Sequence, residues 1–281
     1  MELTVGIVLY NYNEQIVEHL KMLCELFQDI YVFNNSDKEI PDNLEETIKK
    51  LKLSYRSVGK NKGLAFGLNS ICIRAINDKH KWIMLLDQDS LVKKELVNKM
   101  IEFIYKYQSI YKIGCVGPVI QDRYGKKAIQ DSLKNKDVII TSGMILNLDC
   151  FKEIGWFDNK LFVDFVDYDY CLRLRRAGYD VLQNGNAVLF HNQLDNGQVI
   201  HEYQRNKYSA IRHYYNTRNY LFLKREYSEY QNYLLLERDI FWKRIMGMLK
   251  YDHSRIEKIV AILLGYFDFY RNKFGRCTWN I

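Results

Sequence analysis

Short apolar runs alternate with longer amphipathic segments along residues 3–90, and this alternation restricts the possible folds more than any other feature. The apolar runs at 3–10, 29–33, 53–58 and 82–86 predict strands, and the segments between them predict helices. Strands and helices that alternate in this way build βα units on a mainly parallel sheet. The run at 82–86 has no polar residue, as expected of a strand buried on both faces. We therefore predict an α/β fold.

The strand signal continues beyond this region and fades after about residue 200. Further strands are expected at 113–120 and 138–148, and an apolar run at 187–190 precedes a histidine. From residue 203 onward the pattern is helical. Helices are predicted at 63–76, 91–107, 148–154, 167–177, 211–225, 230–249 and 254–274. We predict a domain at 1–200, which is Rossmann-like, and a helical region at 201–281.

The charge is distributed unevenly between these two parts. The chain has 281 residues, 48% of them hydrophobic and only 2 of them Pro, which excludes intrinsic disorder. The whole net charge of +7 lies in residues 201–281, which hold 15 basic and 8 acidic side chains (15 − 8 = 7). These residues also hold 18 of the 40 aromatic side chains. Such a region is attracted to anionic surfaces, either nucleic acid or lipid headgroups.

The cysteines and the N-terminus bear on where the protein works. The six cysteines are widely separated and form no Cys-x-x-Cys pair, so we expect reduced core residues. We identify no signal peptide, and the longest apolar run, 259–267, is too short to span a bilayer. These features predict a cytoplasmic protein, with possible peripheral attachment to the inner face of the plasma membrane.

Two carboxylates one residue apart follow the buried strand at 82–86. In open α/β sheets ligands bind at the carboxyl ends of the strands, and Asp87 and Asp89 are hard oxygen donors that suit Mg²⁺ or Mn²⁺ with phosphate as a further ligand. A solvated turn is the alternative for an Asp-x-Asp pattern alone. The hydrophobic strand before it favours the metal-binding interpretation.

Two further segments have features of binding or catalysis. The glycine-containing loop at 59–69 opens a helix and brings backbone N–H groups near a ligand, although helix packing explains the glycines equally well. In the second segment Asp164, Asp167 and Asp169 gather where a loop enters a helix. One of them is a candidate general base. The alternative is a capping cluster paired with the arginines that follow.

Taken together and in this order, these motifs resemble family 2 glycosyltransferases of the GT-A fold, and in particular their bacterial rhamnosyltransferase branch. The resemblance extends from residue 3 to about residue 225. The matching segments are 5–11, 61–63, 86–90, 141–143, 157–158, 161–173 and 212–219.

The resemblance implies an inverting transfer of a sugar from a nucleotide diphosphate donor to a hydroxyl group. The donor implied by the branch is dTDP-L-rhamnose, and the acceptor is a lipid-diphosphate-linked or polysaccharide glycan of the bacterial cell surface. The family pattern makes Asp167 the catalytic base. It places Asp89 on a Mg²⁺ or Mn²⁺ ion, Asp87 on the ion or the ribose, and His191 among the metal or diphosphate ligands. A structural histidine is the alternative for His191.

Other positions match the donor contacts of the family. The expected nucleotide, diphosphate or sugar contacts are Tyr10, Asn11, Asn34, Asn35, Asp37, Asn61, Gly63, Ser142, Arg212 and Arg218. The chain departs from the family pattern at two places. Asn34-Asn35 replaces the usual Asp-Asn after the second strand, and Val166 replaces the usual Glu before the base. For the two arginines, solvated positions on a helix are the alternative.

The basic and aromatic helices at 201–281 have the composition of helices that lie in a membrane interface. Packing on the catalytic domain or formation of a homodimer explains the same composition. Two other functions remain open at this stage. A sugar nucleotidyltransferase uses a similar sheet edge, but the chain lacks a glycine- and basic-rich triphosphate loop near its N-terminus. A nucleic-acid-binding protein explains the tail but not the aspartates, so we expect no nucleic acid partner.

Overall fold

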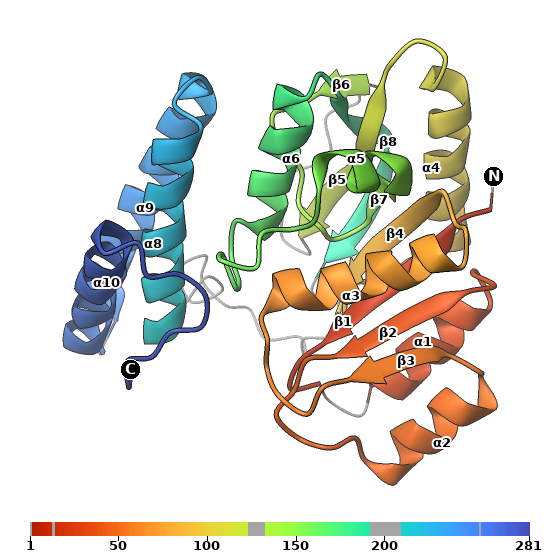
Figure 1. The fold of residues 1–281 in the computed structure, drawn as a ribbon, viewed down its shortest axis with the longest axis horizontal. Helices are drawn as coiled ribbons and strands as arrows, with labels where there is room; N and C mark the ends of the chain where they lie inside the picture. The colour runs from red at the N-terminus through yellow and green to blue at the C-terminus, as the bar shows by residue number, and fades with distance from the viewer. Residues whose placement is uncertain (1, 13–14, 123–132, 192–208, 253) are drawn as a thin grey trace.

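A mixed sheet with helices on both faces forms the body of the protein (Figure 1). The structure is a computed structural model, and it describes residues 2–12, 15–122, 133–191, 209–252 and 254–281. The first half of the sheet has the parallel order β3-β2-β1-β4. Its strands are β1 (Thr4–Leu9), β2 (Ile30–Asn34), β3 (Ser54–Ser57) and β4 (Trp82–Asp87). The helices that connect them are α1 (Ile16–Cys24), α2 (Asp42–Lys50) and α3 (Leu64–Asn77).

The second half of the sheet continues from β4 in the order β7-β5-β8-β6. Its strands are β5 (Ile113–Asp122), β6 (Leu133–Asn135), β7 (Met144–Asn147) and β8 (Asp180–His191). Only β6 and β7 pair in an antiparallel manner with all of their neighbours, so six of the eight strands run in one direction. The remaining helices of the body are α4 (Lys94–Tyr107), α5 (Leu148–Ile154) and α6 (Val166–Arg176). The predicted mainly parallel α/β sheet is confirmed.

Alternating side chains of the strands separate two hydrophobic cores. In β4, Ile83 and Leu85 face the core under α3, α5 and α6, whereas Met84 and Leu86 face the core under α1, α2 and α4. These side chains are almost fully buried. A strand that packs against helices on both faces needs an uninterrupted apolar sequence, which explains the run at 82–86.

Three helices follow the sheet and lie to one side of it (Figure 1). They are α8 (Ala210–Glu226), α9 (Gln231–Tyr251) and α10 (Arg255–Tyr270). Ring contacts and ion pairs join α8 and α9 to the body, for example between Tyr168 and Tyr233 and between Arg176 and Glu226. None of the helices in the described part of the chain is long and apolar enough to cross a membrane.

One strand prediction was wrong, and one strand is longer than its apolar run. The apolar segment at 138–148 is a strand only at β7, because Thr141-Ser142-Gly143 forms a turn in which Gly143 has a φ of 77°. The apolar run at 187–190 is the second part of a longer strand, since β8 begins at Asp180 and accommodates its polar stretch with a register shift opposite Pro118. The boundary near residue 200 lies outside the described residues.

The cysteine prediction is confirmed for most positions. All six side chains are free thiols, and Cys72, Cys115, Cys150 and Cys171 are buried.

Candidate active site

Polar loops meet at the carboxyl ends of β1, β2 and β4. The backbone N–H of Tyr10 donates to Oε1 of Gln88 at 2.9 Å, and Nε2 of Gln88 donates back to the Tyr10 carbonyl at 3.0 Å. The N–H of Asn11 donates to Oγ of Ser36 at 3.0 Å. The loops after three parallel strands are therefore tied together at the edge where α/β sheets bind ligands.

The loop before α3 joins the same assembly through side-chain acceptors. The N–H of Asn61 donates to Oδ1 of Asp37 at 2.9 Å, and the N–H of Lys62 donates to Oδ1 of Asn35 at 2.8 Å. Oδ1 of Asn61 accepts from the N–H of Gly63 at 2.9 Å. The structure thus brings together most of the residues expected to contact the nucleotide. Their contacts with a nucleotide stay a prediction.

Gly63 has a conformational and a steric reason to be glycine. Its φ is 93°, and a Cβ there would lie 2.7 Å from the carbonyl oxygen of Phe162. The next N–H, of Leu64, donates to that same oxygen at 2.6 Å. The start of α3 is consequently fixed against the loop that leads into α6.

The loop at 160–165 has an unusual backbone. Phe162, Asp164 and Phe165 have φ values of 63°, 59° and 64°, a region that non-glycine residues adopt at a cost of about 1 to 3 kcal/mol each. Nδ2 of Asn219 in α8 lies within hydrogen-bond distance of three carbonyl oxygens of this loop, at 2.7 to 3.0 Å. Helix α8 therefore holds the loop in its strained conformation.

The three aspartates around the start of α6 have different partners. Asp164 pairs with Arg212 of α8, with Nη2 and Oδ1 3.0 Å apart. Asp169 is buried, pairs with Arg173 at 3.0 Å, and accepts from the Tyr227 hydroxyl at 2.5 Å. For Asp169 the capping-cluster alternative of an aspartate paired with a following arginine is the better description.

Asp167 accepts hydrogen bonds from the turn at 141 and from the start of its own helix. Its Oδ2 accepts from the N–H and the hydroxyl of Thr141 at 3.0 and 3.3 Å, and its Oδ1 accepts from the N–H of Tyr168 at 3.0 Å. Burial and, to a smaller extent, the charge of Asp87 raise the pKa of Asp167 to about 6, against the opposing effect of the backbone hydrogen bonds. A carboxylate with such a pKa is suited to accept a proton near neutral pH.

A cavity of about 320 Å³ contains both Asp87 and Asp167. These carboxylates come from stretches of chain eighty residues apart (167 − 87 = 80). Ser142 also lines the cavity, and its Oγ lies 2.5 Å from Oγ of Ser90. Asp89 is half-buried in the turn that follows β4, two residues beyond the cavity wall at Asp87.

Two of the C-terminal helices also line the cavity. Arg212 and Asn216 of α8 and Glu237 and Arg244 of α9 line it, and Nη1 of Arg244 donates to Oδ1 of Asn216 at 2.6 Å. Arg212 thus lies on the cavity, and its contact with a donor stays a prediction. Asn216, Glu237 and Arg244 were not predicted to belong to the site; Asn216 lies within the matching segment 212–219, whereas α9, which supplies Glu237 and Arg244, matches no motif.

Arg218 does not lie where it was expected. Its side chain is fully buried, and its guanidinium donates to the carbonyls of Lys160, Leu161 and Gly275 at 2.9 to 3.3 Å. The ring of Tyr214 lies 5.2 Å away. A guanidinium held in this way has its donors directed at the protein backbone, so neither diphosphate binding nor a solvated position describes Arg218.

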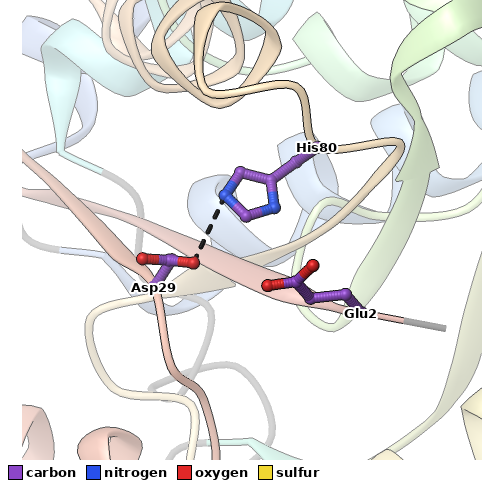
Figure 2. A group of neighbouring side chains, drawn as sticks. All are labelled: Glu2, Asp29 and His80. Carbon is purple, nitrogen blue, oxygen red and sulfur yellow. Dashed lines mark ion pairs between the residues drawn. The ribbon is translucent and has the colours of Figure 1, made fainter.

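The expected metal ligands remain a prediction. The side chain of His191 lies outside the described residues. Among the side chains that the structure describes, one group of three lies close enough together to hold a metal ion: Glu2, Asp29 and His80 (Figure 2). His80 is 3.4 Å from Asp29 in an ion pair. These residues precede β1, β2 and β4, so they lie at the sheet edge opposite Asp87 and are separate from the cavity.

Comparison with known proteins identifies the family. The model of the family "Glycosyl transferase family 2" matches residues 4–167. The chain belongs to this family. The match ends at Asp167 and includes Asp87, Asp89 and the loop at 61–63.

One curated relative and several solved structures are similar to this glycosyltransferase. It is 25% identical to the dTDP-rhamnosyl transferase RfbF of Shigella flexneri over 248 residues, which are 80% of this chain and 81% of RfbF. S. aureus TarS 1–349 in complex with UDP-GlcNAc has a TM-score of 0.57 at 12% identity, with 96% of this chain and 81% of that chain covered. GalNAc-T7 with UDP, GalNAc and Mn²⁺ has a TM-score of 0.59 at 13% identity, with 97% and 57% covered. The predicted GT-A fold is confirmed.

Proposed function

We propose that this glycosyltransferase transfers a sugar, with inversion at the anomeric carbon, from a nucleotide diphosphate donor to a hydroxyl of a cell-surface glycan acceptor. The observation that carries the proposal is the shared cavity of Asp87 and Asp167. One carboxylate lies at the donor edge of the sheet, and the other has a pKa suited to a base. Inversion in a single displacement requires one base and no enzyme nucleophile.

Asp167 takes the acceptor proton in this proposal. The hydrogen bonds from Thr141 orient its carboxylate, and its raised pKa makes the ionised form a stronger base than an ordinary aspartate. The helix start at Val166 and the loop at 160–165 fix the position of the group.

A divalent cation, Mg²⁺ or Mn²⁺, fits the acidic edge of the sheet. Asp87 and Asp89 offer hard oxygen donors beside the loops that would hold the nucleotide. A cation there would neutralise negative charge on the departing diphosphate. The Mn²⁺ in the GalNAc-T7 structure supports this assignment, and His191 remains a proposed further ligand.

The favoured donor is dTDP-L-rhamnose. The similarity to RfbF supports the sugar and the nucleotide, and the UDP-GlcNAc complex of TarS supports a nucleotide-sugar donor in general. We place the nucleotide along the loops of Asn11, Asn34 and Asn61, because these loops are joined at the carboxyl ends of β1 and β2.

The acceptor is proposed to be a lipid-diphosphate-linked or polysaccharide glycan. The exposed face of α9 supports an encounter at an anionic membrane, because Trp242 and Met246 lie beside exposed Lys243 and Lys250. Co-sedimentation with vesicles of phosphatidylglycerol and phosphatidylcholine tests this encounter. Equal recovery of the wild type and Trp242→Ser with those vesicles would argue against it.

A donor panel tests the function directly. The protein is incubated with dTDP-rhamnose, UDP-GlcNAc and UDP-glucose, each with Mg²⁺, Mn²⁺ or EDTA, and nucleoside diphosphate release is measured. We expect release from dTDP-rhamnose with a divalent cation and loss of release with EDTA. Production of pyrophosphate from dTTP and a sugar phosphate would instead identify a nucleotidyltransferase.

A further inference from the structure

Helix α10 has an exposed face made of large apolar side chains. Seven residues of this face are 38% to 81% exposed, with Leu263 in the middle of the face at 62%. They are Ile256, Ile259, Val260, Leu263, Tyr266, Phe267 and Tyr270. We call this set the α10 face. Monomeric proteins rarely expose contiguous apolar patches of this kind.

The orientation of α10 is fixed by its opposite side. Ala261 and Gly265 lie against α8, and a Cβ at Gly265 would be 2.5 Å from the carbonyl oxygen of Tyr214. The hydroxyl of Tyr214 donates to buried Asp268 at 2.6 Å. Rotating α10 to bury the exposed face would break this packing. The face can therefore be covered only by another molecule.

The spacing of the α10 face is that of helix pairing. Its residues recur at steps of three and four over fifteen residues, from Ile256 to Tyr270, which is the heptad pattern of packed helices. The charges favour a second copy over an anionic membrane as the partner. Between residues 256 and 270 the exposed charged side chain is Glu257, and the exposed basic residues Arg255, Arg271 and Lys273 lie at the two ends of the helix. Membrane-surface helices carry Lys and Arg along the whole apolar stripe.

We propose that the α10 face is a homodimer interface in which two copies of α10 pack antiparallel across a two-fold axis at Leu263. Ile256 and Tyr270 lie seven residues before and after Leu263, so this symmetry places the aliphatic half of one helix against the aromatic half of the other. If all seven side chains are fully covered, each copy contributes at most roughly 700 Å² of surface, close to the ~800 Å² per partner of a standard interface. The proposal is independent of the catalytic function.

Light scattering after size-exclusion chromatography tests the association. We expect the wild type to have twice the 33.7 kDa mass of one chain at micromolar concentration. Leu263→Glu should raise the dimer dissociation constant at least ~100-fold, because it places two like charges in the centre of an apolar interface. Trp242→Glu on the exposed side of α9 is the matched control and should remain dimeric. Far-UV circular dichroism of each variant reports whether it is folded.

Cysteine crosslinking tests the axis. Leu263→Cys should form a disulfide between two chains under mild oxidation, because residues on a two-fold axis meet their own copies. Ile110→Cys, which is 69% exposed on the body of the protein, should not. A monomeric wild type would overturn the proposal, whether or not it binds phosphatidylglycerol vesicles. A dimer that is unaffected by Leu263→Glu would overturn it as well.

Discussion

Replacing Asp167 by Asn should change both catalysis and the stability of the fold, and the two effects can be measured separately. The substitution keeps the size of the side chain and removes its ability to accept a proton. We expect transfer to fall by about 10²- to 10⁴-fold, which is the usual contribution of a general base. Donor binding should be retained, because the loops expected to hold the nucleotide come from other segments.

The same change should stabilise the fold above pH 6. Burial raises the pKa of Asp167 from 3.8 to about 6. Because the folded-state pKa is raised, the unfolded chain ionises first, and stability falls as the pH rises from about 4 to about 6. At 1.36 kcal/mol per pKa unit, the gain in the free energy of unfolding of Asp167→Asn is at most about 3 kcal/mol. Solvent in the cavity and the loss of contacts with Thr141 reduce this gain. The ionised carboxylate of Asp167 therefore lowers the stability of the fold above about pH 6.

Urea unfolding at several pH values measures the difference between the two proteins. The advantage of Asp167→Asn should grow between pH 4 and pH 6 and stay constant above. In the wild type, kcat/KM for the donor and acceptor should rise with pH through about 6, since only the ionised carboxylate accepts a proton. A variant with near wild-type turnover would refute the assignment of the base. A stability difference that does not change with pH would refute the burial argument.

Three further predictions follow from single contacts. Gly63→Ala should lower kcat/KM at least about 10-fold, because its new Cβ would displace the loop at Phe162. Gly59 also has a positive φ, but no atom lies within 4 Å of its new Cβ, so Gly59→Ala should lower kcat/KM less. Similar losses for both variants in steady-state assays would contradict the steric explanation. Arg218→Met should lower the free energy of unfolding by about 3 to 5 kcal/mol, because it leaves buried carbonyls unpaired. Arg225 is exposed, so Arg225→Met should change the free energy of unfolding by under about 1 kcal/mol, as measured by urea titration. Asp89→Asn should raise the Mg²⁺ or Mn²⁺ concentration that gives half-maximal rate about 10-fold or more, and an unchanged metal titration would remove Asp89 from the ion.

The parts of the fold that were predictable depend on local patterns. The buried strand at 82–86 and its terminal Asp87 are determined by an apolar run followed by a polar turn, and the sheet brings that end to the ligand edge whatever lies further along the chain. The segment at 138–148 was misread because its apolar residues flank a turn that Gly143 makes possible. Thr141-Ser142-Gly143 is the turn signal that separates these apolar residues from β7.

The site residues that were missed depend on tertiary packing. Arg212 and Arg218 are six positions apart on one helix, and their sequence does not show that the first lies on the cavity and the second inside the protein. Glu237 and Arg244 are two turns apart on the inner side of α9, which matches no motif and reaches the cavity only because α9 packs beside α8. Spacing within a helix predicts a shared face, but it does not predict what that face contacts.

The C-terminal helices are structural components of the active site. The family match ends at Asp167, yet the loop before that residue keeps its left-handed backbone through contacts with Arg218 and Asn219, some fifty positions later. Near the end of the chain, Nη1 of Arg276 lies 3.5 Å from the carbonyl oxygen of Asn61 in the proposed nucleotide loop. Helices α8 and α9 also line the cavity that contains the proposed base. Changes in α8 and α9 would therefore alter the shape of this cavity while leaving the sheet edge and its aspartates in place.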